Sequence, residues 1–82
     1  MKKGAVNLKK VGYKSRNIKR YKRYAQHRDA RGLTDYYIAS RCLIPKSTFT
    51  AWKKGESTPN VDSLMSICKE LGVSISELIG DE

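Results

Sequence analysis

The sequence predicts an all-α fold, a compact domain of five helices. Apolar residues in its second part recur at spacings of three and four, which is the period of one face of a helix. Glycines fall just beyond these periodic runs, where helix C-termini favour them. No run alternates between apolar and polar residues in the way that supports a sheet. With 82 residues, the chain has room for one small core.

The first helix is expected to begin at Ser15 or Arg16 and to end where Gly32 permits a left-handed turn. Four of its residues share one face: Ile18, Tyr21, Ala25 and Arg28. Residues 1–15 precede it, with little apolar content and no clear period. We expect them to form a flexible basic arm, with an ordered strand or helix as the alternative. Residues 16–82 then form the folded domain.

The second and third helices are expected to follow closely. Thr34 is a good N-cap for a second helix that continues to Arg41. Pro45 has a fixed φ and no N–H to lose, so it is a suitable start for a third helix. This helix runs to residue 53 or 54, and Gly55 ends it.

The fourth and fifth helices carry the clearest local signals. Asn60 can cap the fourth helix, whose apolar positions form one inward stripe. These positions are Val61, Leu64, Ile67, Cys68 and Leu71. Ser74 and Glu77 then stand at the spacing of a capping box, in which each side chain bonds the other residue's backbone amide. This box predicts a short fifth helix over residues 75–79.

The predicted core joins the inward faces of these helices. Its members are Leu33, Ile38, Ala39, Ile44, Phe49, Trp52, Val61, Leu64, Ile67, Cys68, Leu71, Val73, Ile75 and Leu78. We also expect the rings of four tyrosines to pack against the protein, because most aromatic rings do so. These are Tyr21, Tyr24, Tyr36 and Tyr37.

The charge is divided unevenly along the chain. Lys and Arg number 17 and Asp and Glu number 8, so the net charge is +9. Residues 1–31 carry a net charge of +11, and residues 32–82 a net charge of −2. An excess of this size indicates an anionic partner or a solvated tail. A membrane partner is not expected, because no apolar run approaches the ~20 residues of a spanning helix.

Enzymatic and metal chemistry find little support in the sequence. Cys42, Cys68 and the single His27 are scattered, so a closed zinc site is not expected. We expect both thiols to be reduced and to fill core or half-core space, as in a cytoplasmic protein. No catalytic motif, cofactor-binding motif or small-molecule site is evident. The sequence therefore predicts a protein that is not an enzyme and that has no cofactor.

The third helix carries the surface of greatest functional interest. Phe49 and Trp52 are three residues apart, so both can enter the core. The remaining residues face outward to varying degrees: Lys46, Ser47, Thr48, Thr50, Ala51 and Lys53. In a DNA major groove, lysine can donate to guanine, hydroxyls can donate or accept, and alanine can contact a thymine methyl. A short helix, a tight link and such a second helix have the layout of a helix-turn-helix reader.

From about Tyr24 to Ile79, the chain resembles the phage-repressor-like helix-turn-helix family, also called XRE or Cro-type, of bacterial, phage and mobile-element regulators. The resemblance rests on the joint order and spacing of short motifs. They are Arg31-Gly32-Leu33-Thr34, Ile38-Ala39, Ile44-Pro45-Lys46-Ser47-Thr48-Phe49-Thr50-Ala51-Trp52-Lys53-Lys54-Gly55, Pro59-Asn60-Val61-Asp62-Ser63-Leu64, Ile67-Cys68-Lys69-Glu70-Leu71-Gly72-Val73-Ser74 and Glu77-Leu78.

The resemblance implies a repressor-like domain whose second and third helices form the reading unit. It implies contacts to base edges from Lys46, Ser47, Thr48, Thr50 and Ala51. It implies contacts to phosphates from Lys53 and Lys54, with support from Arg28 and Arg31. We therefore expect a sequence-specific, double-stranded DNA-binding transcriptional regulator from a prokaryotic or phage context. Because one short helix contacts few base pairs, we expect the protein to bind a palindromic operator as a homodimer.

Three positions differ from the usual pattern of the family. Asp35 stands where the second helix often begins with Gln, whose amide can contact phosphate; a carboxylate would repel it. Leu43 stands where the turn commonly has Gly. The turn must therefore avoid a left-handed residue there or accept strain. His27 occupies a position that is usually aliphatic.

Two other functions remain as alternatives. The first is a protein-interaction module such as an antitoxin or an adaptor. Its contact patch could consist of Tyr36, Tyr37, Met65 and Ile79. The second is a nonspecific binder of RNA or single strands, which the basic arm would favour. The sequence shows no aromatic stacking platform of the kind that such binders use.

Overall fold

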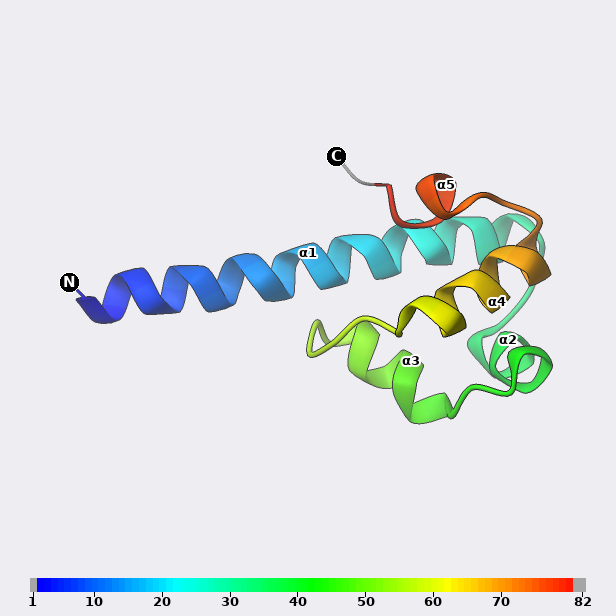
Figure 1. Cartoon of the computed structure of the whole chain (residues 1–82), viewed down its shortest axis with the longest axis horizontal. Coiled ribbons are helices and arrows are strands. Elements are labelled where there is room, and N and C mark those ends of the chain that lie inside the picture. The colour runs from blue at the N-terminus through cyan, green and yellow to red at the C-terminus, as the bar shows by residue number, and fades with distance from the viewer. Residues whose placement is uncertain (1, 81–82) are drawn as a thin grey trace.

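The computed structural model describes the backbone of residues 2–80 and the side chains of residues 14–80. The helices are α1 (Lys2–Ala30), α2 (Asp35–Cys42), α3 (Lys46–Lys53), α4 (Val61–Leu71) and α5 (Ile75–Ile79) (Figure 1). No strand occurs between residues 2 and 80, so the expected all-α, five-helix fold is confirmed. No helix in this range combines the length and apolar composition needed to cross a membrane.

Helix α1 is the long element around which the others are arranged. It runs along the long axis of the molecule, and α2 to α5 gather beside its C-terminal half (Figure 1). The helix begins at Lys2, well before the expected start at Ser15 or Arg16. Low apolar content reports on packing and not on helicity, and no proline interrupts residues 2–30. A separate role for residues 1–15 as a basic arm stays a prediction.

The predicted caps at three helix starts are confirmed. The Thr34 side chain accepts a hydrogen bond from the Tyr37 amide, and Asn60 accepts one from the Ser63 amide. Ser74 and Glu77 form the full capping box of α5, in which each side chain accepts from the other residue's amide. Each cap satisfies an amide that the helix itself leaves without a partner, and so fixes where the helix begins.

Aromatic rings from α1 and α3 form the centre of the core. The Trp52 ring is stacked on the Tyr24 ring with their centroids 5.0 Å apart, and its edge meets the Tyr21 ring at 5.6 Å. Phe49 lies 5.6 Å from Tyr24 by the same measure. Ring pairs in these arrangements stabilise a fold beyond the area that they bury. The core therefore joins the third helix directly to the first, and the rings of Tyr21 and Tyr24 are buried as expected.

Four apolar or aromatic residues were assigned to the interior wrongly. Val61 is 70% exposed and Ile75 is 37% exposed. Each is the first residue after an N-cap, at the edge of its helix's inward stripe. Tyr36 and Tyr37 are also exposed, because the short helix α2 turns Ile38 and Ala39 inward instead. Cys68 is buried and Cys42 is half-buried, as expected for thiols that fill core or half-core space.

A buried amide outside the predicted core connects α1 to the loop after α3. Asn17 is 2% exposed. Its Nδ2 donates to the Gly55 carbonyl at 3.0 Å, and its Oδ1 accepts from the Thr58 hydroxyl at 2.7 Å. A buried amide with both ends bonded specifies one arrangement of its partners. Asn17 therefore fixes the chain where it leaves the third helix.

The turn between α2 and α3 contains a strained residue, which is one of the two outcomes expected for a leucine at position 43. Leu43 has φ of 57° and ψ of 44°, in the left-handed region, and it is the non-glycine residue with positive φ among those described. Its side chain is 90% exposed. In this conformation a Cβ crowds the backbone, at a cost of about 1–2 kcal/mol. Because the Leu43 side chain is exposed, it buries little apolar area that could offset this strain.

Replacing Leu43 with glycine is expected to stabilise the protein by about 0.5–1 kcal/mol, because relief of strain exceeds the entropy that glycine adds to the unfolded chain. Urea unfolding followed by the fluorescence of Trp52 measures the change. Leu43→Ala is the matched control, since it removes the same exposed side chain but keeps the Cβ. A larger gain for alanine than for glycine would contradict the assignment of the strain to the backbone.

Candidate nucleic-acid interface

The polar side of α3 lies on the surface because its two aromatic residues point the other way. Phe49 is 1% exposed and Trp52 is 0% exposed, and both rings contact Tyr24 of α1. Residues of an eight-residue helix that point away from these rings must then face outward. The outward side of α3 is therefore open to a ligand and is held at a fixed angle to α1.

Four of the predicted base-contacting residues line one open groove. They are Ser47, Thr48, Thr50 and Ala51. The opposite wall comes from residues 56–60, which connect α3 to α4, and from Ser63 in α4. Ser47 and Thr50 are exposed, and Thr48 and Ala51 are half-buried. The structure thus brings together residues that can donate, accept and make apolar contact, which is the set that reading base edges requires.

The two lysines of α3 and the C-cap residue Lys54 lie around a second groove on the other flank of the helix. Its lining includes Lys46, Lys53 and Lys54, together with Asp35 and Tyr36 of α2. All three lysines are exposed. Thr50 lines both grooves, so it marks the centre of the outward side. Exposed ammonium groups beside a helix that enters a groove are well placed to neutralise phosphates.

Arg28 has a different environment from these lysines, although the resemblance also assigned it to phosphate. Its Nη1 lies 2.7 Å from Asp35 Oδ1, and its Nη2 lies 2.9 Å from Asp29 Oδ1. Its side chain is 17% exposed. The guanidinium also lies 5.7 Å from the centre of the Tyr24 ring, where a cation is attracted to the ring. Arg28 thus pairs with carboxylates of its own chain.

Asp35 is the centre of this internal network. Its carboxylate accepts hydrogen bonds from the Tyr21 hydroxyl at 2.6 Å, the Tyr24 hydroxyl at 2.7 Å and Arg28 at 2.7 Å. Burial by itself would raise the pKa of Asp35, but these three donors outweigh burial and lower it below its usual value. Asp35 therefore fastens the start of α2 to α1, a role that differs from the contact to phosphate that a glutamine makes there.

Arg31 and His27 lie at the C-terminal end of α1, and the structure does not bring Arg31 to either groove beside α3. The exposed Arg31 donates from Nη1 to the His27 carbonyl at 2.8 Å. His27 Nε2 lies 2.9 Å from the Glu77 carbonyl of α5. The polar ring thus contacts the end of another helix, which accounts for a histidine at a position that is usually aliphatic.

Two features of the interface were missed in the sequence. Ser57 and Thr58 lie across the groove from α3, but a loop residue gives no periodic signal that would place it there. Glu56 lines the same groove and is exposed, so the surface around α3 is not free of acids.

The buried Asn17 could have been predicted from the sequence. It shares the inward register of Tyr21 and Tyr24, at spacings of four and seven residues.

Two short helices joined by a tight turn, with the polar side of the second uncovered, define a helix-turn-helix domain. A family model described as helix-turn-helix matches residues 25–78, and the chain belongs to this family, in its XRE or Cro type. The family is one of DNA-binding domains and is typically non-enzymatic. The chain is therefore a DNA-binding domain.

A curated relative is the HTH-type transcriptional activator BcrR of Enterococcus faecalis. It is 32% identical over 57 residues, which cover 70% of this chain and 28% of the relative. The chain therefore spans less than a third of the length of the relative that it matches. No solved structure matches the chain significantly.

Proposed function

We propose that this protein is a sequence-specific regulator of transcription that reads double-stranded DNA with the outward side of α3 in the major groove. The observation that carries the proposal is the contrast within one helix: Phe49 and Trp52 are fully buried, while Lys46, Ser47 and Thr50 are exposed. The activator named among the relatives supports a role in transcription. The proposal places the protein in the cytoplasm of a bacterium or of a phage-infected cell.

The contacts divide into two classes with different consequences. Lys46, Ser47, Thr48, Thr50 and Ala51 are proposed to contact base edges. Lys53 and Lys54, at the end of α3, are proposed to bind phosphates, as is the exposed Arg31. Arg28 is proposed to act indirectly, because its ion pairs hold α1 against α2. Phosphate contacts position a protein on DNA and base contacts specify the sequence.

The protein is proposed to act as a homodimer on a palindromic operator. Helix α3 has eight residues, and a helix rises 1.5 Å per residue, so it spans about 12 Å. This length covers a few base pairs, which is too little for useful specificity. Two copies on half-sites about one helical turn apart would supply it. Selection of bound duplexes from a random pool tests the proposal: a palindrome is expected, and recovery of unrelated sequences would contradict it.

Changes in α3 are expected to separate the two classes of contact. Lys46→Ala and Thr48→Ala should each reduce the preference for the selected operator over a scrambled duplex by about five- to a hundredfold. Lys53→Gln and Lys54→Gln should weaken both duplexes alike and reduce the salt slope of binding by about 1 each. Titrations by fluorescence anisotropy at several salt concentrations measure both effects.

Lys69→Ala is the control for these changes. Lys69 is an exposed lysine of α4 that lines neither groove beside α3. This variant should keep the operator preference, with at most a small change in affinity. Equal losses of operator preference for Lys46→Ala and Lys69→Ala would contradict the proposed division between base and phosphate contacts.

A protein partner is the second candidate function, and one observation favours it. Tyr36, Tyr37 and Met65 are exposed at 69%, 41% and 54%, and tyrosine and methionine side chains are enriched at protein–protein interfaces. Affinity purification of the native protein tests this candidate. Recovery of a stoichiometric protein partner that displaces the operator duplex would support an antitoxin or adaptor. Recovery of no such partner, together with selection of a palindromic duplex, would support the transcriptional regulator and contradict this second candidate.

A further inference from the structure

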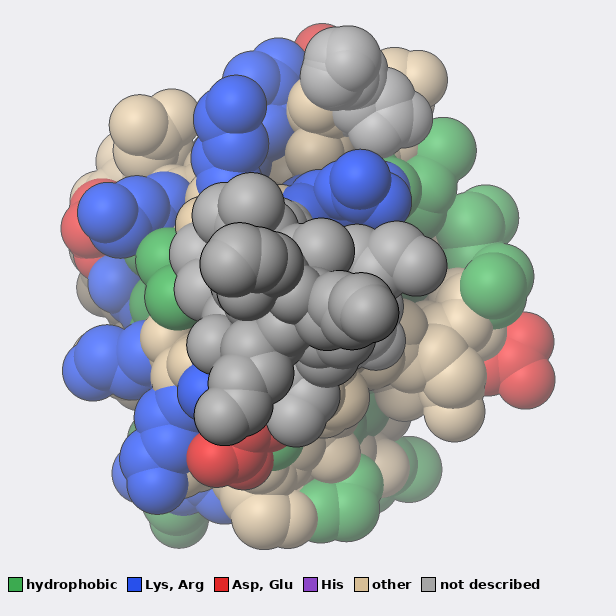
Figure 2. Space-filling model, turned by 90° about the vertical axis from the view of Figure 1, so that its left-hand side faces the viewer, with side chains coloured by type: hydrophobic (Ala, Val, Ile, Leu, Met, Phe, Trp, Pro, Cys, Tyr) green, Lys and Arg blue, Asp and Glu red, His purple; other side chains and the backbone are tan. Residues whose placement is uncertain are grey.

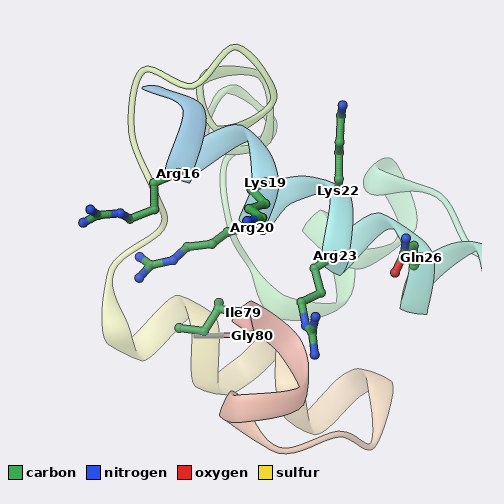
Figure 3. A pocket seen from close by; sticks show the side chains of 8 residues that line it. All are labelled: Arg16, Lys19, Arg20, Lys22, Arg23, Gln26, Ile79 and Gly80. Carbon is green, nitrogen blue, oxygen red and sulfur yellow. The ribbon is translucent and has the colours of Figure 1, made fainter. Parts of the chain in front are cut away.

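A second basic surface, the outer face of α1, lies apart from α3. Its members are Arg16, Lys19, Lys22, Arg23 and Gln26, and all of them are exposed. They line an open groove whose other wall is the end of α5, with Ile79 and Gly80 (Figure 3). Figure 2, which views the molecule from the N-terminal side of α1, shows Lys and Arg side chains over its left and upper parts. The basic charge is thus not confined to the reading helix.

No acid of the described part of α1 offsets this charge. Between residues 14 and 30 the sequence has one acid, Asp29, and this carboxylate is paired with Arg28. Lys19 and Lys22 have no carboxylate within ion-pair distance among the described residues. Arg23 donates from Nε to the Glu77 carbonyl, which is an uncharged group, so its positive charge remains. The face therefore attracts anions over its whole length.

The outer face of α1 and the outward side of α3 point away from each other. Asn17, Tyr21 and Tyr24 lie on the side of α1 that contacts α3 and its following loop. At 100° per residue, Lys19, Lys22 and Gln26 fall on the opposite side of α1. On α3, the buried Phe49 and Trp52 point toward α1, so its polar side faces outward beyond them. A straight duplex in contact with α3 cannot also reach the outer face of α1.

We propose that the outer face of α1 binds a second segment of double-stranded DNA through its phosphates, so that one protein molecule bridges two duplex segments. This proposal rests on the proposed function, since α3 must hold the first segment. The second contact involves lysine and arginine with phosphate and no base edge, and is therefore independent of sequence and strongly dependent on salt.

DNA fits this face better than a membrane surface does. A helix that lies on a membrane inserts an apolar side opposite its basic side, but the side of α1 opposite the basic face is buried in the core with Tyr21 and Tyr24. The face is an extended row along the helix, and a duplex presents an extended row of phosphates. A protein held on DNA by α3 also meets neighbouring DNA at a high effective concentration.

A capture experiment tests the bridge. The selected operator duplex is immobilised and saturated with the native protein, and a labelled duplex of unrelated sequence is then added. Capture of the labelled duplex is expected. The double variant Lys19→Gln/Lys22→Gln should still saturate the operator, but should capture roughly tenfold less of the second duplex. The salt slope of capture should decrease by about 2, one for each phosphate contact removed.

Lys53→Gln/Lys54→Gln is the matched control, because it removes the same charge from the α3 side. It should weaken operator binding but leave capture per bound molecule unchanged.

Several results would overturn the bridge. One is operator binding without capture by the native protein. Another is equal capture by the native protein and by the Lys19→Gln/Lys22→Gln variant, which would assign capture to α3 of a second copy. Binding of vesicles of anionic lipid in place of duplex would assign the face to membranes. Lack of any operator preference in the native protein would instead contradict the proposed function. Failure of the second DNA contact and failure of the proposed function therefore give different results.

Discussion

Gly55→Ala is expected to remove most of the protein's stability at room temperature. Gly55 has φ of +83°, which costs a residue with a Cβ about 1–2 kcal/mol. An added Cβ would lie 2.9 Å from Ile18 Cγ1 and 2.9 Å from the Lys14 carbonyl oxygen. The carbonyl is backbone and cannot turn aside, so overpacking adds about 1–3 kcal/mol. The sum approaches the total stability of about 3–5 kcal/mol expected for a core of this size.

Circular dichroism and the fluorescence of Trp52 report this loss, because Trp52 is the single tryptophan and is fully buried. Gly72→Ala is the matched control. Gly72 has φ of +71°, but an added Cβ would meet no atom within 4 Å. This control should lose about 1 kcal/mol and remain folded. Equal stability of the two variants would show that the close approach of α1 to the loop is not a constraint.

Asp35→Asn is expected to destabilise the protein by about 2–3 kcal/mol. The change removes the carboxylate that lies 2.7 Å from Arg28, in a site where both side chains are four-fifths buried. Among the described residues, Arg28 then keeps only the exposed Asp29 as a charged partner. Removing one member of a buried ion pair costs more than the pair contributes, because the remaining charge stays desolvated. The hydroxyls of Tyr21 and Tyr24 also exchange a charged acceptor for a neutral one. Urea unfolding at pH 7 measures the loss.

Glu70→Gln provides the comparison for this change. Glu70 pairs with Arg41 at 3.2 Å, but the Arg41 side chain is 58% exposed. Exposed pairs contribute about 0–1 kcal/mol, so this variant should be almost as stable as the native protein. A loss for Glu70→Gln as large as that for Asp35→Asn would show that burial of the network has no special effect.

The pH dependence of the Asp35 network has a defined sign. Because the folded protein lowers the pKa of Asp35, its contribution to stability is fully present above the unfolded pKa of about 4. It is lost as the pH falls through the folded pKa. The difference in unfolding free energy between the native protein and Asp35→Asn should therefore be large at pH 7 and should shrink below pH 4. Glu77 also has a lowered pKa, through its bond to the Ser74 amide, but it is present in both proteins and cancels.

The same network shows why the polar contacts could not be derived from the sequence. A carboxylate at the first residue of a helix is stabilised by the helix dipole. The dipole by itself therefore explains an aspartate at position 35, and nothing in the sequence indicates further partners. Its partners Tyr21 and Arg28 are 14 and 7 residues away. Side-chain bonds over such separations depend on how the helices pack, and no periodic pattern reports them.

Local chemistry in the sequence determined the four helices α2 to α5, their caps and the buried faces around Ile67 and Trp52, because turns, caps and helical periods depend on neighbouring residues. Tertiary structure decided the exposure of Val61 and Ile75, the internal pairing of Arg28, and the amide of Asn17 under the loop after α3. It also decided that Lys19 and Lys22 of α1 lie on the side of the helix opposite to α3. These features arise when distant segments meet, and the free energy of such contacts depends on the geometry of both partners.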